Sequence, residues 1–142
     1  MMLDIVNLQR KVPLKSATFR EFVQSLIPAV DEAEGKTFTV AFVSDDRMKQ
    51  LNSLFRGKEA TTDVLSFPRQ PDEFDPHKNE LGDIVISAEQ ARKQCSESGL
   101  SLDEEVKQLI LHGLLHLCGY DHETDGGEMN ARELVLRKKL SI

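Results

Sequence analysis

The stretch from residue 108 to residue 120 constrains the fold most, because it carries no formally charged residue when its histidines are neutral. Its leucines and isoleucine fall on opposite sides of a helical wheel, and a helix that is apolar almost all round is buried. The polar exceptions, Gln108, His112 and His116, are spaced four residues apart. We therefore expect a central buried helix with one polar stripe along it.

The two histidines of this helix belong to a longer pattern, HGLLHLCGYDH, with the spacing H-x-x-x-H-x-x-G-x-x-H. Side chains four residues apart on a helix have Cβ atoms ~5–6 Å apart, so His112 and His116 can meet at one ion. Gly119 allows the chain to leave the helix in a left-handed conformation and to bring His122 to the same place. Three histidines leave a fourth tetrahedral position open, as in a catalytic zinc site.

Two other interpretations of the histidines stay open at this point. His112 and His116 could be core residues hydrogen-bonded to the backbone, with His122 exposed in a turn. Alternatively, Cys118 or Asp121 could add a fourth ligand and close a structural zinc site. Cys118 follows His116 by two residues, about 200° round the helix, so we expect its thiol to point away from the metal.

One position departs from the extended zinc motif of metzincin proteases, HExxHxxGxxH, because Gly113 replaces the glutamate that acts there as general base. Zinc still lowers the pKa of a bound water, and Asp121 is the nearest candidate to assist. A peptide has a poor amine leaving group, whereas the 2′-hydroxyl or metal hydroxide can cleave a phosphodiester whose charge a cation stabilises. The substitution therefore favours phosphodiester cleavage over peptide cleavage without deciding between them.

A second group of candidate residues is basic. Arg56 ends a predicted helix, where the helix dipole favours a cation, so its position alone indicates a structural role. Arg47, Lys49 and Lys58 lie close to it in sequence. The four cations could form a local phosphate-binding surface on a protein whose net charge is −6.

Helices and strands mix in this sequence without strict alternation, which favours an α+β domain with a small mixed sheet of about four strands packed with helices. Strands are expected at residues 3–8, 37–43, 64–67 and 81–86. Helices are expected at residues 16–30, 45–56 and 126–140, from Ser87 to near Gly99, and from Ser101 into the histidine motif. The prolines and charges of residues 68–80 predict an exposed, mobile loop.

Local signals set the expected helix ends. Pro28 should shorten or bend the first helix, and Gly35 should stop it. Met48, Leu51 and Phe55 are the expected buried stripe of the second helix. Ser44 is the expected N-cap of the second helix, and Gly57 is its expected stop. Capping boxes of Ser87 with Gln90 and of Ser101 with Glu104 are expected to begin the next two helices.

Composition limits the class of protein. A length of 142 residues suits one domain, and 39% apolar with 30% charged residues is an ordinary soluble balance. No apolar run approaches the ~20 residues of a membrane span, and the first residues have the wrong charge order for a signal peptide. Two cysteines, Cys95 and Cys118, suit a reducing compartment, so we expect no disulfide and a cytoplasmic protein without a membrane partner.

Three segments, LNSLFRGKEATTDVLSFP, LGDIVIS and LHGLLHLCGYDHETD, together resemble the YbeY family of bacterial endoribonucleases, also called rRNA maturation factors. The resemblance runs from about Ser44 to Met129. It implies a zincin-like α+β fold in which His112, His116 and His122 bind one zinc ion. It also implies catalytic roles for His116 and Arg56, which reverses the interpretation of Arg56 from position alone.

The activity that the resemblance implies is metal-dependent cleavage of single-stranded RNA. This activity would serve maturation of the 3′ end of 16S ribosomal RNA and ribosome quality control. The partners would be ribosomal RNA and the small ribosomal subunit or its associated proteins. Residues 1–142 would then form a single metal-dependent endoribonuclease domain.

Two alternative functions belong to other classes. One is a zinc metallopeptidase or another metallohydrolase with its base supplied elsewhere, and the other is a non-catalytic, ribosome-associated protein whose metal stabilises the fold. Asp63 and Asp83 are expected to make local backbone hydrogen bonds, with orientation of a ligand histidine as their functional alternative. Ser66 and Phe67 could border the cleft, and His77 is expected to be a solvated loop residue.

Overall fold

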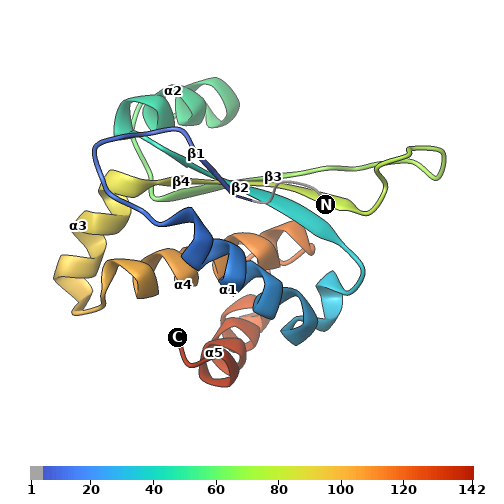
Figure 1. Cartoon of the computed structure of the whole chain (residues 1–142). Coiled ribbons are helices and arrows are strands. Elements are labelled where there is room, and N and C mark those ends of the chain that lie inside the picture. Colours follow the sequence, from blue (N-terminus) through green and yellow to red (C-terminus); the bar gives the residue numbers. More distant parts are fainter. Residues whose placement is uncertain (1–4) are drawn as a thin grey trace.

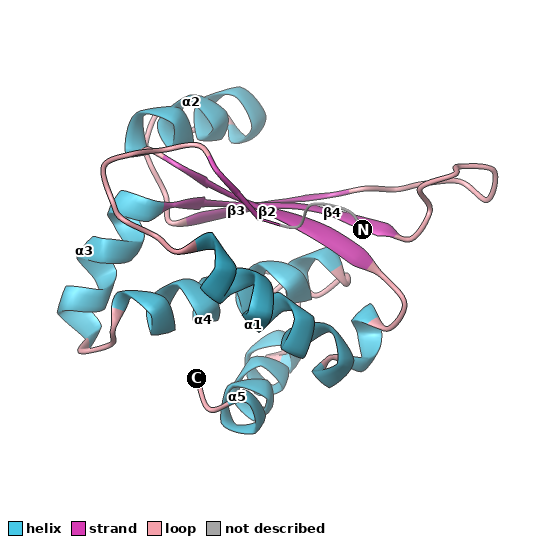
Figure 2. Cartoon of the chain, in the orientation of Figure 1, coloured by secondary structure: helices cyan, strands magenta, loops and turns pink. Residues whose placement is uncertain are grey.

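Residues 5–142 are described by the computed structural model, in which four strands form one sheet with helices on both faces (Figures 1 and 2). The strands are β1 (Ile5–Asn7), β2 (Thr37–Val43), β3 (Val64–Pro68) and β4 (Glu80–Ser87). Their order is β1-β2-β4-β3, with parallel pairing except between β3 and β4, which are antiparallel. The predicted α+β class with a four-stranded mixed sheet is confirmed.

The helices lie unequally on the two faces of the sheet. They are α1 (Ser16–Ala29), the 3-10 turn η1 (Asp31–Ala33), α2 (Asp45–Arg56), α3 (Ala88–Ser98), α4 (Leu102–Leu117) and α5 (Glu128–Leu140). Figure 1 shows α1, α4 and α5 on one side of the sheet and α2 alone on the other. The main core therefore lies on the side of α4.

The core explains why α4 is apolar almost all round. Ile110, Leu111, Leu114 and Leu115 are all fully buried, although they point in different directions around the helix. The sheet contributes alternate residues to the same core, such as Ile84 of β4, because successive side chains of a strand point to opposite faces. The expected central buried helix is confirmed.

Cap geometry follows the sequence signals with one exception. Ser101 and Glu104 form the expected reciprocal capping box at the start of α4. Ser87 accepts from the Gln90 amide, but the Gln90 side chain donates to Asp45 Oδ2 at 2.9 Å instead of returning to the cap. The predicted capping box of Ser87 with Gln90 is therefore wrong, because Asp45 of α2 offers the Gln90 side chain a charged acceptor.

Several element boundaries differ from the prediction. Helix α1 continues through Pro28 to Ala29, since a proline in the last turn removes only one hydrogen bond. Turn η1 then separates α1 from Gly35, which therefore does not end that helix. Helix α5 starts at Glu128, two residues later than expected, because its cap Gly127 has a φ of +103°. Residues 3 and 4 of the predicted first strand lie outside the described residues.

The expected buried stripe of α2 is partly wrong. Met48 is fully buried, but Leu51 is half-buried and Phe55 is 60% exposed. Asn52 is buried instead, and its side-chain amide donates to the Ala60 carbonyl at 2.7 Å. The ring of Phe55 meets Phe67 of β3 edge to face and lines an open groove over the sheet, so most of the ring faces solvent.

The segment between β3 and β4 is exposed. Within it, Arg69 forms ion pairs with Asp75 at 2.6 Å and with Glu80 at 3.0 Å. His77 is exposed on this segment, as expected for a solvated loop residue. Both cysteines are free thiols. Within residues 5–142, no helix combines the length and the apolar character needed to cross a bilayer.

Candidate active site

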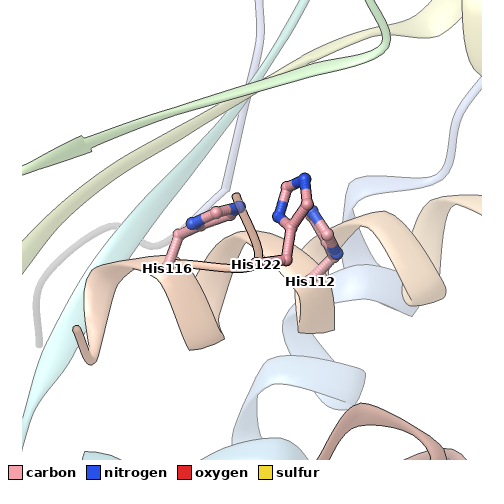
Figure 3. Close-up of side chains that lie close together, drawn as sticks. All are labelled: His112, His116 and His122. Atoms are coloured by element: carbon pink, nitrogen blue, oxygen red, sulfur yellow. The ribbon is translucent and has the colours of Figure 1, made fainter. Parts of the chain in front are cut away.

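The three motif histidines come together in space. His112 and His116 project from α4, and His122 comes from the loop that follows it (Figure 3). Their ring centroids are 4.9 to 5.4 Å apart, and one candidate ligand atom from each lies within 4.8 Å of the others. Among residues 5–142, no other set of three His, Cys, Asp or Glu side chains converges in this way.

The turn after α4 brings His122 back to the helix. Gly119 has a φ of +103°, a left-handed conformation that side chains disfavour. The Gly119 amide donates to the His116 carbonyl at 3.0 Å, and the Tyr120 amide donates to the Leu115 carbonyl at 3.0 Å. These bonds close the end of the helix and reverse the chain, as the sequence predicted for Gly119.

The hydrogen bonds of the two helical histidines leave the same ring nitrogen free. His112 Nδ1 lies 2.8 Å from Glu133 Oε1, and His116 Nδ1 lies 3.0 Å from the Tyr120 carbonyl oxygen. A carbonyl or carboxylate oxygen can only accept, so Nδ1 carries the hydrogen in both rings. Each Nε2 then keeps a lone pair for a metal.

This donor set fits a metal ion. Neutral imidazoles suit zinc, and a hydrogen-bonded second nitrogen is the usual arrangement for a metal-binding histidine. Two nitrogens on one tetrahedral zinc lie about 3.4 Å apart, so small side-chain rotations would bring the three rings together. Burial lowers the pKa of His116, which favours the neutral form that a metal requires.

Sequence reasoning missed Glu133 as the partner of His112. Glu133 is 6% exposed on α5. Burial alone would raise the pKa of its carboxyl, but the hydrogen bond with His112 and the charge of Arg137 hold that pKa below its usual value. The signal in the sequence is an acid at helical spacing between Met129 and Leu136, which are both buried.

Neither of the two aspartates considered for orienting a ligand histidine, Asp63 and Asp83, has that role in the structure. Asp63 accepts from the Val64 amide at 2.8 Å, which is the expected local backbone hydrogen bond. Asp83 is exposed on β4, where it faces away from the histidines because its neighbour Ile84 points to α4. Ser66 does border the cleft, and its hydroxyl donates to the Gly113 carbonyl at 3.3 Å.

A second interaction missed in the sequence fixes the loop that supplies His122. The Tyr120 hydroxyl donates to Glu32 of η1 at 2.6 Å, and Arg132 of α5 donates two hydrogen bonds to the same carboxylate. These bonds with Arg132 lower the pKa of Glu32 to about 2. Tyr120 is thereby held where its carbonyl meets His116.

The structure explains the glycine at position 113. A Cβ atom on Gly113 would lie 2.7 Å from Cγ2 of Ile84, because α4 packs directly on β4 at this point. Any side chain here would point into the sheet rather than into the cleft. A general base at position 113 is therefore excluded by packing, and Asp121 is one of the carboxylates that line the cleft.

An open cleft of about 570 Å³ lies beside the histidines. Residues 64–66 of β3 line it opposite α4, and Arg56 and Glu123 lie at its margin, with Arg56 Nη2 3.9 Å from Glu123 Oε1. Of the four cations that the sequence grouped together, Arg56 alone lines this cleft, and Lys49 borders a separate depression beside Asp46 and Glu59.

Cys118 does not take part in the histidine site. It packs against the main core and does not line the cleft, as its place on the helix predicted. Burial raises the pKa of its thiol to about 11, and the neutral thiol is a poor metal ligand. The structure thus gives no support to a closed site with Cys118 as fourth ligand.

Comparison with known proteins gives one consistent result. The family model described as Endoribonuclease YbeY matches residues 4–141. The endoribonuclease YbeY of Nautilia profundicola is 50% identical over 107 residues, which cover 75% of this chain and 74% of the relative. That of Thermodesulfovibrio yellowstonii is 32% identical over 152 aligned positions, covering 97% and 94%.

A solved structure also matches. A Thermotoga maritima protein, known from its solution structure, superposes with a TM-score of 0.66 at 28% identity and covers 98% of this chain and 89% of its own. The match extends over the sheet and over the helix that carries the histidines. With the family model matching nearly the whole sequence, the chain belongs to the YbeY family of endoribonucleases.

Proposed function

We propose that residues 1–142 form one domain that cuts single-stranded RNA in the maturation of the 3′ end of 16S ribosomal RNA. Membership of the YbeY endoribonuclease family supports the RNA-cleaving activity. The observation that carries the rest is the convergence of His112, His116 and His122 beside an open cleft with an arginine at its margin. The proposal includes zinc as the bound ion and the cytoplasm as the place of action. It also includes the small ribosomal subunit as partner and a role in ribosome quality control.

The chain's own residues have distinct parts in this proposal. Arg56 is 41% exposed and contacts Glu123 only at 3.9 Å, so its guanidinium is available to bind a phosphate. Glu133 and the Tyr120 carbonyl hold two ligand rings in their binding tautomer. Asp121, which lines the cleft, would accept a proton. A bound zinc would supply Lewis acidity towards the phosphoryl group and a lowered pKa for water.

Neither alternative function has a specific observation in its favour. In HExxH metallopeptidases the general base occupies the position of Gly113, whose Cβ position is filled by Ile84, so a peptidase would need its base elsewhere. A purely structural zinc would need a fourth protein ligand, and the converging group within residues 5–142 has three members. The open fourth position favours catalysis.

The test is cleavage of an RNA with a single-stranded 3′ tail by variants that are checked for folding and for bound metal. Arg56→Ala should lower cleavage by at least about 100-fold because it removes a charge-stabilising group, and His116→Ala should do so because it removes a metal ligand. Matched controls are His77→Ala and Arg47→Ala, which change the same residue types away from the cleft. Equal cleavage by all five proteins, or none by the folded wild type, would contradict the proposal.

A further inference from the structure

The sheet face on the side of α2 is only partly covered. Thr39, Ala41, Asp83 and Val85 alternate with core residues along β2 and β4, so they point to this face. Helix α2 lies over one end of the sheet, and the end towards the β3–β4 loop has no helix above it (Figure 1). A groove of about 460 Å³ runs beside the last turn of α2.

Two aromatic rings form one side of this groove. Phe55 of α2 and Phe67 of β3 meet edge to face with centroids 5.1 Å apart. Phe55 remains 60% exposed, so a large flat apolar surface faces solvent. An exposed aromatic ring at the edge of a sheet is the kind of surface on which an unpaired base stacks.

The groove and the cleft of the candidate active site lie on opposite sides of strand β3, and neighbouring residues line them. Phe55 lines the groove, and the next residue, Arg56, lines the cleft. Strand β3 separates the two, because Ser66 points to the cleft and Phe67 to the groove. A chain whose phosphate contacts Arg56 therefore has its neighbouring base within reach of Phe55.

The charge of the groove selects the part of a nucleotide that enters. Asp83 is the one charged residue among those that line it, so a phosphate is repelled. A carboxylate accepts hydrogen bonds from the amino groups of bases, and Thr39 adds a hydroxyl. The groove thus suits a base, while the basic group, Arg56, lies just outside it.

We propose that this groove binds one unpaired nucleobase of the RNA substrate, stacked on Phe55, while Arg56 holds the adjacent phosphate. The inference rests on the proposed RNA cleavage and adds a substrate-binding subsite to it. Phe55 is then a positioning residue for RNA, and its loss should affect binding of the substrate more than the chemical step.

The first test compares Phe55→Ala with Leu54→Ala in cleavage of the tailed RNA. Leu54 is the matched control, because it is 75% exposed on the same helix and does not line the groove. Phe55→Ala should raise KM by about 5- to 150-fold, the range for one stacked base, with little change in kcat. Phe55→Trp should restore KM, and Leu54→Ala should leave it unchanged.

The second test uses fluorescence, because the chain has no tryptophan. In Phe55→Trp, single-stranded RNA should quench the new indole when metal is chelated to prevent cleavage and folding is checked by circular dichroism. In Leu54→Trp the same RNA should leave the emission unchanged. An oligoribonucleotide without bases should quench neither variant.

The outcomes separate this inference from the proposed function. If wild type cleaves RNA and Phe55→Ala has an unaltered KM, the base subsite is overturned while the nuclease stands. Such a result would leave the aromatic surface to a protein partner. If folded, metal-loaded wild type neither binds nor cleaves RNA, both proposals fail. Raised KM with rescue by Phe55→Trp supports the subsite.

Discussion

At the scale of single residues, two ligand rings depend on a neighbour that contacts no substrate. His112 is oriented by a carboxylate from α5, and His116 by a backbone carbonyl from the next loop. The carboxylate partner can be removed by mutation, whereas the carbonyl cannot. Glu133 is therefore the residue at which this orientation can be tested.

Glu133→Ala should weaken metal binding by about 10- to 100-fold, because His112 loses the acceptor that fixes its tautomer and ring position. Competition with a chromophoric chelator measures this affinity without RNA. Asn130→Ala is the matched control, since Asn130 is exposed on the same helix. An unchanged affinity in Glu133→Ala would show that the hydrogen bond does not support the metal site.

Gly113 gives a second prediction at this scale. Gly113→Ala gains helix propensity of about 1 kcal/mol, but its Cβ must displace Ile84, so we expect a net loss of about 1–2 kcal/mol in unfolding free energy. Urea unfolding measures it. Adding Ile84→Ala should make the double variant more stable than the sum of the single effects predicts. A fully additive result would contradict the proposed contact.

At the scale of elements, the loop after α4 is positioned by segments far away in sequence. Glu32 in η1 accepts from Tyr120 and from Arg132 of α5. Three elements thus meet at one carboxylate, and the loop that carries His122 is fixed to the fold through it. The position of the third histidine therefore depends on this ion pair.

The pKa of Glu32 sets the pH dependence of the stabilisation that its hydrogen bonds with Arg132 provide. Because the bonds from Arg132 lower that pKa from 4.5 to about 2, the stabilisation is complete above pH 4.5 and is lost as pH falls towards 2. Because solvent screens this partly exposed ion pair, we expect it to contribute roughly 1–2 kcal/mol. Arg132→Gln should lower stability at pH 7 and flatten its fall below pH 4.5, as measured by urea unfolding. A parallel pH profile in both proteins would contradict this role.

At the scale of the whole molecule, local patterns predicted the parts of the site that lie within one segment. The buried helix, the spacing of His112 and His116, and the turn at Gly119 all depend on neighbours in sequence, so sequence alone was sufficient. Glu133 and Glu32 depend on how distant helices pack, and no local pattern contains that information.

The exposure of Phe55 is a further limit of sequence reasoning. Its spacing from Met48 is typical of a buried helix face, and the structure leaves it exposed because the sheet face is wider than α2. The extent to which one element covers another is a property of the whole fold. The pattern of apolar residues along α2 therefore could not predict that Phe55 is exposed.

Removal and return of the metal tests most directly whether the three histidines hold a catalytic ion. We expect about one zinc ion per chain, loss of RNA cleavage on chelation with the circular dichroism spectrum retained, and recovery of cleavage when zinc is added back. Full cleavage by metal-free protein would contradict a catalytic metal. Unfolding on chelation would instead indicate that the three histidines hold a structural ion.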